Sequence, residues 1–108
     1  MTTLEKDLFS VTLIESIVIP SSVKFIGCEC FSCCKNLEKV EFHDDSQLKI
    51  IDDFAFQNTK LRNITIPRHV VEIKANSFEN CKNLQEYNFS DDSELKKKLK
   101  IVHFLEVE

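Results

Sequence analysis

Glycine is almost absent from this sequence, with Gly27 the one example in 108 residues. Tight turns that need a left-handed backbone must then rely on asparagine, aspartate and serine, which tolerate that conformation or bond to their own backbone. Long apolar runs are also absent, which excludes a membrane-spanning helix of about 20 apolar residues. Positive charge is not in excess, since the net charge is −4. The composition therefore gives no electrostatic case for nucleic-acid binding.

A secretory signal is missing from the start of the sequence. Residues 1–10 carry Glu5, Lys6 and Asp7 where such a signal has its apolar region. The sequence as given is therefore predicted to stay in the cytoplasm. Its length fits one domain.

One stretch of the sequence occurs twice. Residues 34–48 and 81–95 are identical at nine of fifteen positions and lie 47 residues apart. A shorter period lies within this distance. Apolar residues recur at offsets 0, 3 and 5, at steps of 23, 24 and 23 residues, from Ile14, Leu37, Leu61 and Leu84. That spacing is typical of repeat units of roughly 20–29 residues, which stack to share one core.

The repeat resembles a known family. The pattern Ile-x-Ile-Pro-x-x-Val-x-x-Ile begins at Ile17 and again at Ile64, and each copy is followed by a phenylalanine and a cysteine. It is similar to the BspA-like leucine-rich repeats, also called the treponemal type, over residues 14–95. The resemblance implies a non-enzymatic solenoid that binds proteins, often at the surface of bacteria or protist parasites. It carries over no catalytic residues. The small position before the phenylalanine differs between units: Cys30, Ala55 and Ser77.

We expect an α/β fold, a leucine-rich-repeat solenoid with about 3.5 units of 23–24 residues. Each unit should place a short parallel strand on one face and a short helical turn on the other, and phenylalanines should close the core on the helical side. The units are residues 14–36, 37–60, 61–83 and the partial 84–95. Residues 1–13 are predicted to be an N-terminal cap, with a short helix starting at Thr2 and a strand near Leu13. Residues 96–108 are predicted to be a C-terminal cap or edge strand.

The candidate binding surface is the outward face of the predicted parallel sheet. Side chains alternate along a strand, and columns on adjacent strands lie about 4.8 Å apart, so these residues should form one mixed polar face. A merely solvated face fits the same pattern. The candidate residues are Ser16, Val18, Lys39, Glu41, Arg62, Asn63, Thr65, Glu86 and Asn88.

Cysteines offer a second candidate site. Four of the five lie within residues 28–34, and clustered thiolates can bind zinc. The spacing of a zinc motif is absent, however, and an odd number of cysteines cannot pair completely in disulfides. Cys34 and Cys81 also occupy one repeat position. We therefore predict reduced, mostly buried thiols, with no metal and no cofactor.

Histidines and paired aspartates give weaker signals. His43, His69 and His103 have no cysteine or serine partner at a matching repeat position, so catalysis is not indicated. The pairs at residues 44–45 and 91–92 lie two units apart, about 10 Å by strand spacing, too far to share one calcium ion.

Three functions from different classes fit these observations. The first is a non-enzymatic module that binds a protein or peptide through its sheet face. The second is a self-assembling unit, a homodimer through the solenoid ends or a piece of a larger array, because uncovered strand edges can pair. The third is a small metal-binding protein that uses the cysteine cluster.

Overall fold

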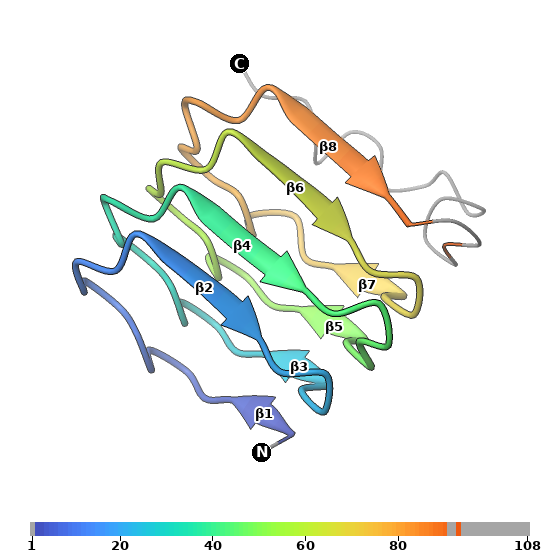
Figure 1. The fold of residues 1–108 in the computed structure, drawn as a ribbon. Coiled ribbons are helices and arrows are strands. Elements are labelled where there is room, and N and C mark those ends of the chain that lie inside the picture. The colour runs from blue at the N-terminus through green and yellow to red at the C-terminus, as the bar shows by residue number, and fades with distance from the viewer. Residues whose placement is uncertain (1, 91–92, 94–108) are drawn as a thin grey trace.

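The computed structural model describes residues 2–90 and 93. In this part the chain winds into a solenoid, and each full coil contributes one long and one short strand (Figure 1). The long strands have four residues each: β2 (Ser16–Ile19), β4 (Lys39–Phe42), β6 (Asn63–Ile66) and β8 (Glu86–Phe89). The short strands have two residues each: β1 (Thr3–Leu4), β3 (Phe25–Ile26), β5 (Ile50–Ile51) and β7 (Glu72–Ile73).

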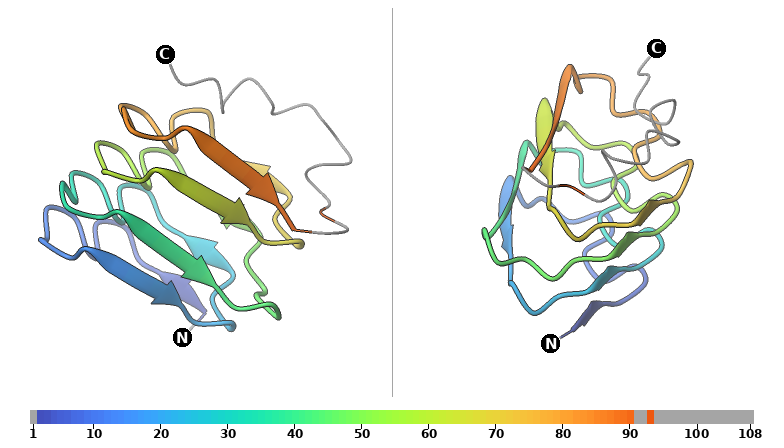
Figure 2. Two further views of the ribbon diagram at one scale, coloured as in Figure 1. Left: turned by 45° about the horizontal axis from the view of Figure 1, so that its top comes forward. Right: turned by 90° about the vertical axis from the view of Figure 1, so that its right-hand side faces the viewer.

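The two kinds of strand form two layers (Figure 2). The short strands make one continuous parallel sheet in the order β1-β3-β5-β7. The long strands make two separate parallel pairs, β2 with β4 and β6 with β8. This differs from the single parallel sheet predicted on that face.

The core lies between the layers and repeats from coil to coil. Inward side chains of the short strands form one buried column: Leu4, Ile26, Ile51 and Ile73. A second column consists of phenylalanine rings, stacked with centroids 5.2–5.4 Å apart: Phe9, Phe31, Phe56 and Phe78. The prediction that phenylalanines close the core on the face opposite the long strands is confirmed. Since a single coil could bury neither column alone, stacking supplies the core.

The predicted helical turns are wrong, because the described residues form no helix. Chain segments such as residues 27–34 instead alternate two kinds of hydrogen bond. The N–H of Cys30 donates to the Gly27 carbonyl three residues back, whereas the N–H of Phe31 donates to Ala55 in the next coil at 2.8 Å. An α-helix needs bonds four residues back in an unbroken run. Because every second N–H in these segments donates to the next coil, that run is broken and no helix forms.

The segments that follow the short strands, such as residues 27–34, are called the convex segments here. Residues with a left-handed backbone also interrupt them. Among the described residues, seven other than glycine have positive φ: Asp7, Val11, Glu29, Cys33, Phe54, Asn58 and Asn80. The expectation that asparagine, aspartate and serine carry such turns holds for three of them. The other four are held in a conformation they disfavour because the bonds to neighbouring coils fix the backbone.

The first coil differs from its prediction as well. Thr3–Leu4 is a strand paired with Phe25–Ile26, and residues 6–11 form turns, so neither the initial helix nor the strand near Leu13 is present. Residues 96–108, including the predicted C-terminal cap and His103, lie outside the described residues, as do residues 91–92 of the second aspartate pair. No helix in the described ranges is long and apolar enough to cross a membrane.

Side chains between coils explain why the sequence repeats at 47 residues as well as at half that distance. The thiol of Cys34 donates to the Phe9 carbonyl at 3.0 Å and lies 3.5 Å from the Thr12 hydroxyl. The same geometry recurs 47 residues later, where Cys81 meets the Phe56 carbonyl at 3.0 Å and the Thr59 hydroxyl at 3.3 Å. Threonine coils therefore alternate with cysteine coils, and the repeating unit is a pair.

Candidate functional site

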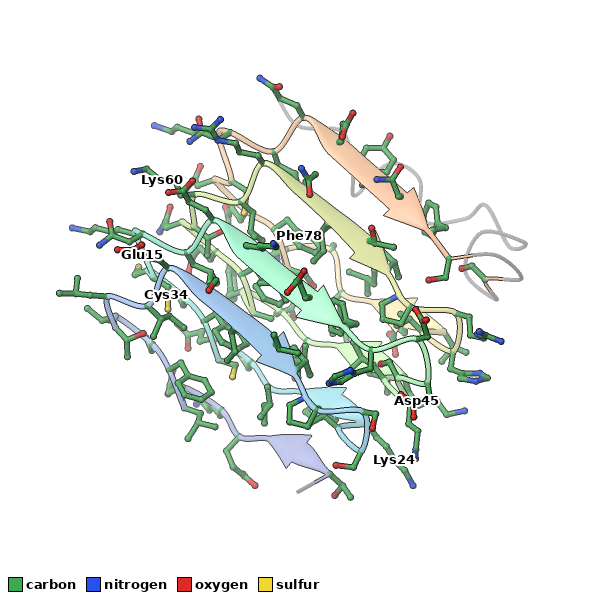
Figure 3. All side chains as sticks on the ribbon, viewed as in Figure 1. Glu15, Lys24, Cys34, Asp45, Lys60 and Phe78 are labelled. Carbon is green, nitrogen blue, oxygen red and sulfur yellow. The ribbon has the colours of Figure 1, made fainter. Side chains whose placement is uncertain are left out.

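The predicted sheet-face residues lie on the outer side of the long strands, and all are exposed. Ser16 and Val18 are on β2, Lys39 and Glu41 on β4, Asn63 and Thr65 on β6, and Glu86 and Asn88 on β8, with Arg62 just before β6. Figure 3 draws these side chains on the ribbon, and Cys34 and Phe78, which it labels, are buried. A binding role for this face stays a prediction.

The long-strand layer is interrupted between β4 and β6. The Arg62 carbonyl accepts from Glu86 of β8, and the Ile66 carbonyl accepts from Ser90 just after β8, so the even-numbered residues of β6 face β8. Alternate residues of a parallel strand bond to opposite neighbours. Asn63 and Thr65 therefore direct their main-chain groups toward β4.

The β2–β4 ladder has the corresponding register, with Ser16 opposite Lys39 as Asn63 is opposite Glu86. Lys39 and Glu41 therefore face β2, and Val40 and Phe42 face β6. No ladder joins β4 to β6 in the described residues. The facing N–H and C=O groups of these strands are left outside any ladder.

Proline gives a physical reason for the interruption. At the end of the β6–β8 ladder, the N–H of Ser90 donates to the Ile66 carbonyl at 3.0 Å. The corresponding residue for a β4–β6 ladder is Pro67, which has no N–H to offer the Phe42 carbonyl. A β4–β6 ladder would therefore lack the hydrogen bond at its carboxyl end.

A groove with a cavity volume of about 590 Å³ lies along the interruption. Its walls are β4 and β6, and it extends past their carboxyl ends to the end of β8. Its lining brings together four of the predicted site residues: Lys39, Glu41, Asn63 and Thr65. The other five do not line it: Ser16, Val18, Arg62, Glu86 and Asn88. Sequence reasoning missed further lining residues, among them His43, Asp44, Pro67, Arg68 and Ser90.

Charges of both signs balance in the groove. Lys39 Nζ lies 3.4 Å from the Glu41 carboxylate on the same strand. Arg68 and Asp44 add one positive and one negative side chain near the carboxyl ends of the strands. With the histidine neutral, the formal charges of the lining sum to zero. The groove is therefore suited to polar, uncharged groups rather than to a polyanion.

The cysteine cluster does not form a preassembled metal site. Cys30 and Cys34 are buried, whereas Cys28 and Cys33 are half-buried. The described residues bring no three metal-type side chains together. Burial raises the pKa of the Cys30 thiol to about 12, and burial followed by Glu29 raises the pKa of Cys28. Burial also raises the pKa of Cys81. Thiols held protonated are poor nucleophiles and poor metal ligands.

Histidines remain apart from these thiols. His43 and His69 are exposed and follow β4 and β6, while the cysteines of residues 28–34 lie on the convex segment. Asp44 lines the groove, and Asp45 is exposed at the edge where the long strands end (Figure 3). The described residues therefore show no nucleophile paired with a base.

Comparison with known proteins agrees with the repeat architecture. The family model described as "BspA type Leucine rich repeat region (6 copies)" matches residues 2–99. A search of curated protein sequences gives no match.

Solved structures of bacterial leucine-rich repeat proteins are similar to the structure of this chain. The pneumococcal vaccine antigen PcpA is 28% identical with a TM-score of 0.84, over 87% of this chain and 24% of that one. A leucine-rich cell surface protein of Faecalibacterium prausnitzii is 32% identical with a TM-score of 0.68, over 75% of this chain and 20% of that one. A leucine-rich repeat protein of Bacteroides capillosus is 28% identical with a TM-score of 0.69, over 82% and 63%.

This chain spans about a quarter or less of the first two of these proteins. Its stacked coils, its phenylalanine column and the match over residues 2–99 lead to one assignment. The chain belongs to the BspA-type leucine-rich repeat family.

Proposed function

We propose that this chain is a non-enzymatic interaction module that holds a protein or peptide partner on the outer face of its long strands. The observation that carries the proposal is the groove between β4 and β6, which gathers Lys39, Glu41, Asn63 and Thr65 on that face. Clefts with several convergent polar groups are the usual places for ligands. The family supports binding over catalysis, and the repeat positions account for most candidate reactive side chains.

A selection for peptide binders tests this proposal. The full chain is exposed to a phage-displayed random peptide library, and the binders are measured against three variants with the same charge change. Glu41→Lys and Glu86→Lys alter the long-strand face, whereas Glu79→Lys alters the exposed convex segment. Binders should lose affinity for the first two and keep it for the third. The proposal fails if no binder depends on the long-strand face.

The location of this chain bears on what its partner is. The sequence as given predicts the cytoplasm, whereas the similar protein of F. prausnitzii is named a cell surface protein. We propose a surface location by analogy with that protein, which would present the groove to partners outside the cell. Protease shaving of intact cells, followed by detection of the chain with an antibody, distinguishes the two locations.

A second candidate function is self-association. Leu8 is 43% exposed in the first coil, although Cys30, Ala55 and Ser77 at the same repeat position are fully buried. Val11 and Leu13 are 69% and 75% exposed. Apolar residues gathered at one end of a solenoid favour pairing with a second copy. Light scattering over a range of concentrations, with reductant present, tests this candidate, and Leu8→Glu should then abolish a mass near twice 12.6 kDa.

A further inference from the structure

We infer that the groove between β4 and β6 binds an extended, uncharged polar peptide segment that inserts carboxamide or hydroxyl side chains between the two strands. This inference rests on the proposed function and adds to it the position of the ligand and its chemistry.

Main-chain N–H and C=O groups that belong to no ladder face the gap between β4 and β6. Val40 and Phe42 direct N–H and C=O groups across the groove at those of Asn63 and Thr65, and no ladder joins the strands in the described residues. Each wall therefore offers donors and acceptors in alternation. A ligand that both donates and accepts at each point satisfies them best, as a carboxamide or a hydroxyl does.

The distance between β4 and β6 excludes the insertion of a whole β-strand between them. Cα atoms of β4 and β6 still approach within 8 Å of one another. A strand inserted between two others needs neighbours about 4.8 Å away on both sides, so the two walls would have to stand about 9.6 Å apart. A peptide must therefore lie on the outer face, along the groove, and reach inward with side chains. Successive side chains of an extended segment on one face match the spacing of the wall residues.

Charge narrows the class of peptide. Lys39 and Glu41 pair with each other at 3.4 Å, and the lining as a whole has no formal net charge. A strongly charged partner would gain little and would have to displace this pair. Asparagine, glutamine, serine and threonine are the side chains that fit both the charge and the main-chain groups.

The connection after β6 provides a specific variant. Pro67→Ser restores an N–H where Ser90 has one in the β6–β8 ladder, so β4 and β6 can pair and close the groove. Pro20→Ser is the matched control, because Pro20 ends β2 in the same way and no long strand precedes β2 in the described residues. Thr65→Trp fills the groove instead, and Val18→Trp is its control at the same repeat position on β2.

Amide chemical shifts of the ¹⁵N-labelled full chain give the readout. The probe is an acetylated synthetic peptide of alternating serine, asparagine and glutamine, and a chitooligosaccharide serves as a hydroxyl-rich comparison. The peptide should shift the amides of Val40, Phe42, Asn63 and Thr65. Pro67→Ser and Thr65→Trp should each weaken binding about tenfold or more, the equivalent of one or two hydrogen bonds. The two control variants should bind as the parent does.

Outcomes separate this inference from the proposed function. Shifts centred on β2 or β8 that Pro67→Ser leaves unchanged overturn the groove assignment, while binding by the long-strand face stands. Groove shifts with the saccharide and none with the peptide overturn the peptide assignment. Absence of shifts anywhere on the long-strand face with the peptide also overturns the inference, and the library selection then decides separately whether that face binds peptides at all.

Discussion

The two strand layers of this solenoid are built from the same coils, yet one is continuous and the other is interrupted. All four short strands join in one parallel sheet, whereas the long strands join only in pairs. The convex segments beside the short strands also bond at every step, as when Phe9, Phe31 and Phe56 each donate to the next coil at 2.8 Å. Hydrogen bonds therefore hold adjacent coils together on the short-strand side, so the long strands β4 and β6 can remain unpaired without separating their coils.

This difference shows how a repeat protein can make a binding site without losing its repeat. A break in a single-layered sheet would expose the core. Here the phenylalanine column and the short-strand column hold adjacent coils together behind the break. The long-strand face can accordingly lose a ladder at modest cost, since each net hydrogen bond contributes only about 1 kcal/mol.

The largest expected effect comes from breaking the continuous side. Phe56→Ala removes a fully buried ring that stacks on both neighbours, and it should lower the free energy of unfolding by about 3–5 kcal/mol. Tyr87→Ala, in the long-strand layer, should cost clearly less because Tyr87 is 36% exposed. Urea unfolding followed by circular dichroism compares them. Equal costs would remove the proposed difference between the layers.

Gly27 tests how tightly the short-strand side is packed. A Cβ atom at this position would lie 2.8 Å from the Leu4 carbonyl oxygen and 2.8 Å from the Lys6 nitrogen, both backbone atoms. Gly27→Ala should therefore cost about 1–3 kcal/mol, as overpacking does. Hydrogen exchange should show the loss concentrated in residues 3–12. Cys28→Ala is the neighbouring control, and uniform loosening along the chain would contradict local crowding.

Alkaline pH should weaken the same side through Cys30. Its folded pKa is about 12 against an ordinary value of 9.0, so between these values the unfolded chain loses the proton while the folded chain keeps it. Stability is then complete below about pH 9 and declines as the pH rises, by about 2 kcal/mol at pH 10.5. Cys30→Ala should have a shallower decline between about pH 8 and pH 10.5 in urea unfolding. An unchanged slope would mean that the thiol is not held protonated.

The smallest effect concerns the interrupted side and leaves stability unchanged. Amide protons of Val40 and Phe42 should exchange about tenfold or more faster than those of Lys39 and Glu41, because only the latter pair faces the β2 ladder. Hydrogen exchange followed by NMR measures all four in one sample. Equal protection of alternate residues in β4 would show that a ladder to β6 does form in solution.

Most of the fold could be predicted from the sequence, because apolar residues record which side chains face the core. The strand positions and the stack of Phe31, Phe56 and Phe78 both follow from this periodicity. The same periodicity could not show whether the convex segments are helical. Whether an N–H such as that of Phe31 bonds within its own coil or to Ala55 in the next depends on contacts between coils, which one repeat does not record.

The site was predicted less completely than the fold. Alternation along the strands placed Lys39, Glu41, Asn63 and Thr65 on an exposed face, but it treated all steps between coils as alike. One signal distinguishes the step from β4 to β6: Pro67 follows β6, whereas His43 follows β4 and Ser90 follows β8. The repeat pattern presents this proline as one of its regular positions, but the proline also removes a donor from a ladder between β4 and β6.

Alternation of two coil types fixes how such an array can grow. Duplication of a single coil would place two coils of one type side by side and would disturb both the Thr–Cys contact and the pattern of closed and open steps. Duplication of 47 residues preserves both. Each added pair would then contribute one more groove, about 9.6 Å further along the array. A partner with regularly spaced polar side chains could engage successive grooves together, and its avidity would rise with the number of pairs.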